Sequence, residues 1–113
     1  MSDAGVSNPS GHIFRVDKFV VPLAARTEFL SKVRATHERL RTVPGFVQDD
    51  ILEQTSGPGE FNCVTFVAWI SDDCIAAAPA AVMDLHRQMG FNPQAMYAQL
   101  GIKADVGTYT RVG

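Results

Sequence analysis

The sequence has few of the features that assign a function at sight. Its two cysteines, Cys63 and Cys74, form no Cys-x-x-Cys pair and have no histidine at zinc-site spacing, so a structural zinc site of that kind is excluded. We expect both to be free, buried thiols in a reducing compartment. The longest apolar run, residues 75–83, is interrupted by Pro79 and is too short to cross a bilayer.

Neither sign of charge predominates in the sequence. The formal net charge is −2 and acidic and basic residues are interspersed, so nucleic acid finds no basic stripe to bind. No glycine-rich loop precedes a helix, and no serine-nucleophile motif occurs. Residues 1–11 are polar, lack the apolar centre of a secretory signal and are expected to form a flexible tail. These absences predict a cytoplasmic protein that binds neither membranes nor nucleic acid.

The 113 residues suit a single domain, here residues 12–113. Hydrophobic periodicity predicts strands at residues 12–21, 46–55, 60–70 and 103–112, and helices at residues 24–41 and 71–89 with a short helix after Pro93. Pro79 is expected to kink or split the second helix, and Asn92 to cap the short one. This order predicts an α+β, ferredoxin-like β-α-β-β-α-β fold with an antiparallel sheet and helices on one face.

The third predicted strand indicates an oligomer. Its two alternating faces are both apolar, with Cys63, Val67 and Trp69 on one and Val64 and Phe66 on the other. Such a strand needs cover on both sides, and one helical layer supplies only one. We therefore expect the bare sheet face to pack against a second copy of the chain, forming a homodimer shaped as an α/β barrel.

Two corner motifs carry a family resemblance. Pro44-Gly45-Phe46 joins the first helix to the second strand, and Trp69-x-Ser71-x-Asp73 joins the third strand to the second helix. With this architecture, residues 12–112 resemble the antibiotic-biosynthesis-monooxygenase-like family. The resemblance implies a monooxygenase that needs no cofactor and acts on a small aromatic substrate such as a quinol, a phenol or an anthrone. The deprotonated substrate would pass an electron directly to O2.

Matching positions qualify the resemblance. The anthrone-oxidising members hold their substrate with an asparagine four residues before the corner tryptophan, where this chain has Thr65. The haem-degrading branch has a second tryptophan nine residues after the first, where this chain has Ala78, and its histidine ligand would fall at Arg87, with His86 one residue away. A haem-binding or haem-degrading protein is therefore the second alternative.

Two residues are candidates for catalysis. His37 interrupts the apolar stripe of the first helix, where a partly buried imidazole would serve as general base or would be a satisfied core histidine. Asp17 lies at mid-strand between apolar neighbours. If Asp17 faces a pocket, burial would raise its pKa and suit it to base chemistry. If it lies at the rim, it would pair with Arg15 or Lys103.

Candidate substrate-binding residues are mostly aromatic or adaptable, namely Trp69, Thr65, His86, Met83 and Tyr109. Trp69 would form a pocket wall or simply pack the corner, and Thr65 would orient the ring. The first alternative to an enzyme is a non-catalytic dimeric barrel that binds a small molecule or has a structural role. The replacement of asparagine by Thr65 favours this alternative.

Overall fold

The computed structural model describes residues 11–112, so the expected N-terminal tail lies outside this range except for Gly11. The strands are β1 (Ile13–Val20), β2 (Phe46–Glu53), β3 (Cys63–Trp69) and β4 (Lys103–Thr110). The helices are η2 (Leu23–Ala25), α1 (Arg26–Leu40), α2 (Asp72–Ile75), α3 (Ala78–Met89) and α4 (Pro93–Leu100). All strand pairs are antiparallel, in the order β2-β3-β1-β4. The predicted ferredoxin-like α+β fold is confirmed.

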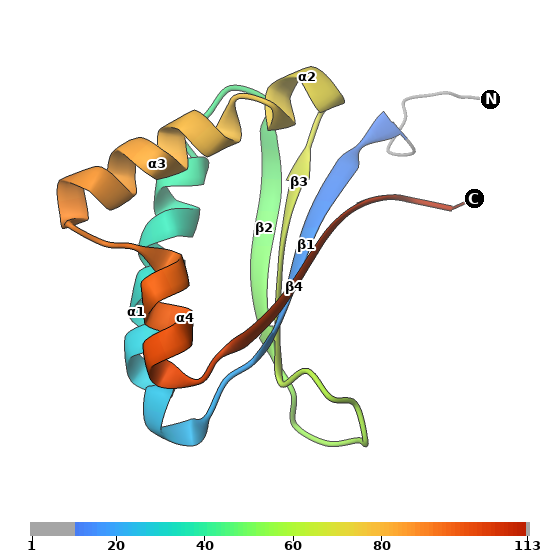
Figure 1. Ribbon diagram of the computed structural model, residues 1–113. Coiled ribbons are helices and arrows are strands. Elements are labelled where there is room, and N and C mark those ends of the chain that lie inside the picture. The colour runs from blue at the N-terminus through green and yellow to red at the C-terminus, as the bar shows by residue number, and fades with distance from the viewer. Residues whose placement is uncertain (1–10, 113) are drawn as a thin grey trace.

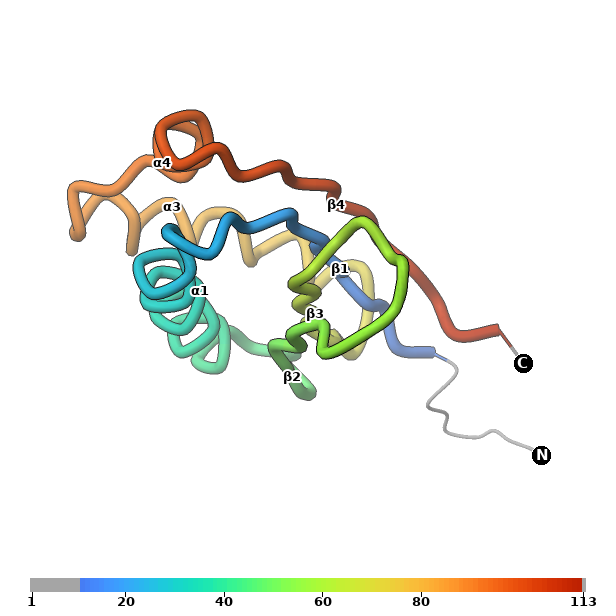
Figure 2. The backbone as a smooth tube through the Cα atoms, turned by 90° about the horizontal axis from the view of Figure 1, so that it is seen from below, coloured from blue at the N-terminus to red at the C-terminus, as the bar shows by residue number. Residues whose placement is uncertain are grey.

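The helices lie on one side of the sheet (Figure 1). In the view from below, α1, α3 and α4 form a layer beside the strands, and no helix of residues 11–112 covers the opposite side (Figure 2). The core between the layers has two parts, one around Phe19 and Phe29 and one around Val67 and Trp69. Within residues 11–112 nothing covers the other face of the sheet, and the expected packing of a second copy against it stays a prediction.

The two corner motifs touch each other. The Ile70 N–H donates to the Gly45 carbonyl at 2.9 Å, and the Phe46 ring meets the Trp69 indole edge-on with 6.1 Å between centroids. Gly45 has a φ of +90°, and a Cβ on it would lie 2.2 Å from the Cys74 sulfur. Only glycine allows this approach, because it combines a positive φ with no side chain. The motifs therefore mark one packed corner.

Proline and cap signals place the helix ends. Pro79 lies in the first turn of α3, where it needs no hydrogen-bond donor, and the predicted second helix is split into α2 and α3 just before it. The Asn92 side chain accepts from the Ala95 N–H at 3.1 Å, which confirms the predicted cap of α4. Ser71 has the extended backbone of a cap residue, but its hydroxyl makes no hydrogen bond to the α2 backbone.

A bulge in β2 changes the predicted face of one residue. Strict alternation along residues 46–55 would place Phe46 and Leu52 on the same face of the sheet. In the structure Phe46 pairs with Trp69 and Gln48 with Ala68, so the register shifts across Val47. The extra residue turns Phe46 toward the helices, while Leu52 remains on the open face and is half-exposed. β3 is also shorter than predicted, beginning at Cys63 rather than residue 60.

Candidate functional site

A pocket lies between the helices and the sheet, beside the Trp69 corner. Its volume is about 470 Å³, and a smaller space of about 180 Å³ adjoins it. The two spaces share lining residues, including Asp17, Thr65 and His86, so together they form one helix–sheet pocket. Most of the wall of the larger part is apolar: Leu40, Val67, Trp69, Ile75, Val82 and Met83. An apolar cleft with a few polar groups is the usual form of a small-molecule site.

The sheet supplies the floor of this pocket. β1 and β3 pair so that Asp17 lies opposite Thr65 and Ile13 lies opposite Trp69. Alternate residues of a strand point to the same face, so these side chains all face the helices. Thr65 is 4% exposed and Trp69 1% exposed. Three of the predicted site residues, Asp17, Thr65 and Trp69, therefore share the pocket floor.

Asp17 lines the pocket and also pairs with Arg15. The structure therefore shows both a pocket-facing carboxylate and an ion pair, which the sequence had offered as alternatives. Arg15 Nε donates to Asp17 Oδ1 at 3.0 Å along the same strand face. Burial raises the pKa of Asp17, and the Arg15 guanidinium opposes that rise without cancelling it. A carboxylate with a raised pKa among apolar walls accepts a proton more readily than an exposed one.

The helices supply the opposite wall, where His86 and Met83 of α3 line the pocket. The Thr36 hydroxyl donates to the Lys32 carbonyl at 3.0 Å, and the same oxygen lies 3.4 Å from His86 Nε2. Because the hydroxyl hydrogen is already donated, Nε2 is the donor in that contact. Burial lowers the pKa of His86, so its ring is neutral at neutral pH.

His37 lies between α1 and the sheet but does not line the helix–sheet pocket. Its Nδ1 is 2.7 Å from Asp49 Oδ2, and the ring is 4% exposed. Arg41 also binds Asp49, through Nε at 3.0 Å and Nη2 at 2.9 Å. Burial raises the pKa of Asp49, but the hydrogen bonds from Arg41 and His37 outweigh it, so this pKa is lowered. His37 is thus a buried histidine held by a carboxylate.

Tyr109 lies on the open face of the sheet, away from the helix–sheet pocket. It is 44% exposed and lines a shallow hollow with Phe14, Val16, Val64 and Phe66. Its parity in β4 opposes that of Val106 and Thr108, so the pleat directs it away from the helices. The structure therefore brings together Asp17, Thr65, Trp69, Met83 and His86 and leaves out His37 and Tyr109.

Sequence reasoning missed Arg15, Thr36 and Gln94 as pocket residues. Arg15 had a usable signal, since it is two residues before Asp17 in a strand and must share its face. Thr36 and Gln94 had none, because their placement depends on how α1 and α4 rotate against the sheet. Within residues 11–112, no three histidine, cysteine or acidic side chains gather to hold a metal ion.

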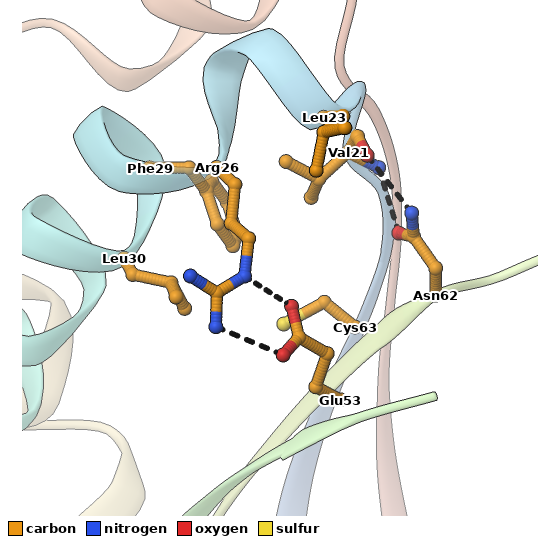
Figure 3. Close-up of a pocket in the computed structure, with 8 residues that line it drawn as sticks. All are labelled: Val21, Leu23, Arg26, Phe29, Leu30, Glu53, Asn62 and Cys63. Carbon is orange, nitrogen blue, oxygen red and sulfur yellow. Dashed lines mark hydrogen bonds and ion pairs between the residues drawn. The ribbon is translucent and has the colours of Figure 1, made fainter. Parts of the chain in front are cut away.

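A separate small pocket of about 110 Å³ lies near the start of α1 (Figure 3). Arg26 binds Glu53 through two hydrogen bonds of 2.6 and 2.9 Å, beside the Cys63 sulfur. Asn62 pairs with both backbone groups of Val21, at 2.8 Å each. Burial raises the pKa of the Cys63 thiol, so it stays protonated and unreactive. These hydrogen bonds tie the start of α1 to the end of β2, and tie Val21 to the residue before β3.

No protein-family model matches the chain, and no curated protein matches its sequence. Solved structures do. SnoaB, a cofactor-independent oxygenase from Streptomyces nogalater, is 25% identical with a TM-score of 0.66, over 91% of this chain and 95% of SnoaB. A Nitrosomonas europaea protein provisionally assigned as an antibiotic biosynthesis monooxygenase is 16% identical with a TM-score of 0.67, over 90% of this chain and 91% of that one.

A third similar structure is a mutant of MhuD with two manganese protoporphyrin IX molecules bound per active site. It is 18% identical with a TM-score of 0.69, over 89% of this chain and 95% of MhuD. These neighbours confirm the resemblance to the antibiotic-biosynthesis-monooxygenase-like proteins. The two neighbours with identities below 25% establish the fold alone, and the fold hosts more than one chemistry. No helix within residues 11–112 is long and apolar enough to span a membrane.

Proposed function

We propose that the protein is a cofactor-independent monooxygenase that oxidises a small aromatic compound with an acidic hydroxyl, such as a quinol, a phenol or an anthrone. The observation that carries this proposal is a single carboxylate, Asp17, held with a raised pKa on the floor of an apolar pocket. The likeness to SnoaB, itself a cofactor-independent oxygenase, supports the same activity.

This chemistry requires only a few groups from the protein. Asp17 accepts the proton of the substrate hydroxyl, leaving an electron-rich aryloxide or enolate. That anion transfers one electron to O2, and the resulting radical pair combines to a carbon-bound peroxide. The peroxide takes back the proton from Asp17 and loses water together with the hydrogen on the same carbon, leaving a carbonyl. Trp69 and Met83 supply flat and adaptable apolar surfaces for the ring, and Thr65, opposite Asp17, supplies a hydroxyl for orientation. Apolar walls exclude water, which strengthens each electrostatic contact inside.

Oxygen uptake over a panel of hydroquinones and anthrones tests this proposal. We expect uptake above the rate without protein, and a loss of at least about 100-fold in Asp17→Asn, since general base catalysis contributes roughly that much or more. If His37 is the base instead, His37→Gln will show that loss and Asp17→Asn will not. Arg26→Gln, which breaks an ion pair outside the pocket, is the control.

The alternative of a binding protein without catalysis predicts a different result in the same experiment. Panel compounds would then bind and quench the Trp69 fluorescence, while O2 uptake stayed at the rate measured without protein. Haemin titration tests the haem alternative, in which a Soret shift would depend on His86. A saturating Soret shift that is lost in His86→Ala would replace the present proposal with a haem function.

We further propose that a second copy of the chain covers the open face of the sheet and closes the barrel. Phe14 and Phe66 lie on this face with 6.3 Å between ring centroids, and the shallow hollow that they line has a volume of about 320 Å³. Contiguous apolar surface of this kind marks an interface. In sedimentation velocity, the wild type should be a dimer and Phe66→Asp a monomer. Leu23→Asp, on an 86% exposed residue away from the face, should remain a dimer.

A further inference from the structure

Arg15 lies at the mouth of the helix–sheet pocket with unused hydrogen-bonding capacity. It lines the larger part of the pocket beside Asp17 and is 44% exposed. Its Nε donates to Asp17, and within residues 11–112 its two terminal nitrogens make no hydrogen bond. A guanidinium has five N–H donors in a planar fork, so it binds one oxyanion while keeping or exchanging another.

Apart from His86, Arg15 and Asp17 are also the only acidic or basic residues that line the larger part of the pocket, among those the structure describes. The other ionisable groups facing this space are occupied or neutral. Burial keeps the His86 ring neutral, and Tyr97, which lines the smaller part of the pocket, keeps its proton because burial raises its pKa.

Two other basic side chains nearby have partners of their own. The Lys32 ammonium lies over the Phe91 ring, 5.1 Å from its centroid, in the smaller part of the pocket. His37 is held by Asp49. An anion formed on a substrate in the larger part of the pocket therefore has one cationic partner within reach, the Arg15 guanidinium.

We infer that Arg15 binds the substrate oxyanion, and that the Arg15–Asp17 ion pair exchanges partners when the substrate loses its proton. Before the transfer, the pocket holds the guanidinium, the carboxylate and a neutral hydroxyl. Afterwards it holds the guanidinium, a protonated Asp17 and an aryloxide, so the net charge is unchanged. No uncompensated charge is created among apolar walls, which would be costly. This inference rests on the proposed function and assigns it an anion-binding residue.

Para-nitrophenol tests the assignment without relying on turnover. Its phenol and phenolate forms have distinct absorption spectra, so a pH titration of the bound compound reports its apparent pKa inside the pocket. We expect wild-type protein to lower this pKa below its value in solution. Arg15→Gln should raise the bound pKa and weaken phenolate binding about 10- to 100-fold, the usual size of a hydrogen bond to a charged group. Arg15→Lys should restore part of the loss.

The opposite substitution should have the opposite effect. In Asp17→Asn, Arg15 loses its competing carboxylate, so we expect tighter phenolate binding and a lower bound pKa than in wild type. Para-nitrotoluene, which has the same shape but no acidic hydroxyl, should bind all variants equally. Arg26→Gln is the matched control, because Arg26 also donates through Nε to a carboxylate and is 45% exposed.

Two outcomes would overturn the inference. One is a bound pKa that does not change in Arg15→Gln, and the other is an equal loss of affinity for para-nitrophenol and para-nitrotoluene, which would indicate a packing role. Failure of the proposed function is distinguishable from either. If the quinol and anthrone panel gives no O2 uptake but the nitrophenol shift depends on Arg15, the oxyanion site stands and the oxygenase proposal falls.

Discussion

Replacing Gly45 by alanine should destabilise the protein through two separable effects. The first is conformational, because Gly45 has a φ of +90° and a residue with a Cβ loses about 1–2 kcal/mol in left-handed backbone. The second is steric, since the new methyl group would lie 2.2 Å from the Cys74 sulfur and 2.4 Å from its Cβ. Overpacking of this kind costs about 1–3 kcal/mol. We expect a total loss of about 2–5 kcal/mol in the free energy of unfolding.

Gly57→Ala separates the two effects. Gly57 has a φ of +105°, but no atom lies within 4 Å of its added Cβ, so it reports the conformational cost alone. Urea unfolding followed by circular dichroism measures both variants, with an unchanged m-value required for the comparison. Equal losses in the two variants would refute the close approach of Gly45 and Cys74. A Gly45→Ala loss that shrinks in the Cys74→Gly background would confirm the coupling.

Three further predictions concern other parts of the molecule. Asn62→Ala should lower the free energy of unfolding by about 2 kcal/mol or more, since it leaves two backbone groups of Val21 unpaired, whereas the exposed cap variant Asn92→Ala should lose only about 1 kcal/mol in the same urea titration. The lowered pKa of Asp49 gives stability that is present above the usual value of 3.8 and is lost as pH falls through the folded-state pKa. The difference in unfolding free energy between wild type and Asp49→Asn should therefore become smaller as the pH falls below about 3.8. A difference that does not depend on pH would contradict this assignment. Trp69, the single tryptophan, is 1% exposed, so its emission should resist iodide quenching yet respond to aromatic ligands; easy quenching would place it at the surface.

Much of the fold was predictable because its signals are local. Alternation in residues 12–21 and 60–70 identified β1 and β3 and their faces, since the side-chain period of a strand does not depend on its neighbours. Pro79 and Asn92 likewise marked helix boundaries through their own backbone chemistry. The bulge at Val47 was not visible, because it is defined by the pairing of β2 with β3 rather than by the sequence of β2.

The candidate site shows the same contrast between local patterns, which are visible in the sequence, and contacts between distant segments, which are not. Asp17, Thr65 and Trp69 share one face of adjacent strands, so their parity alone made them plausible neighbours. His37 was a sound candidate by burial and chemistry. Its placement depended on Asp49, twelve residues away in the chain, whose carboxylate holds the imidazole beside the edge strand β2. No local pattern reports a contact of this kind.

The sequence by itself determined the order of elements, the side of the sheet that the helices cover and the apolar character of the face they leave open. Those features follow from periodicity, capping and turn chemistry, which act over a few residues. Only the tertiary structure decided that Arg15 and Asp17 face a pocket together, that His86 and Met83 complete its wall, and that His37 lies outside it. The physical reason is that strand register and helix rotation are set by packing between segments far apart in the chain, and that packing determines which side chains share a space.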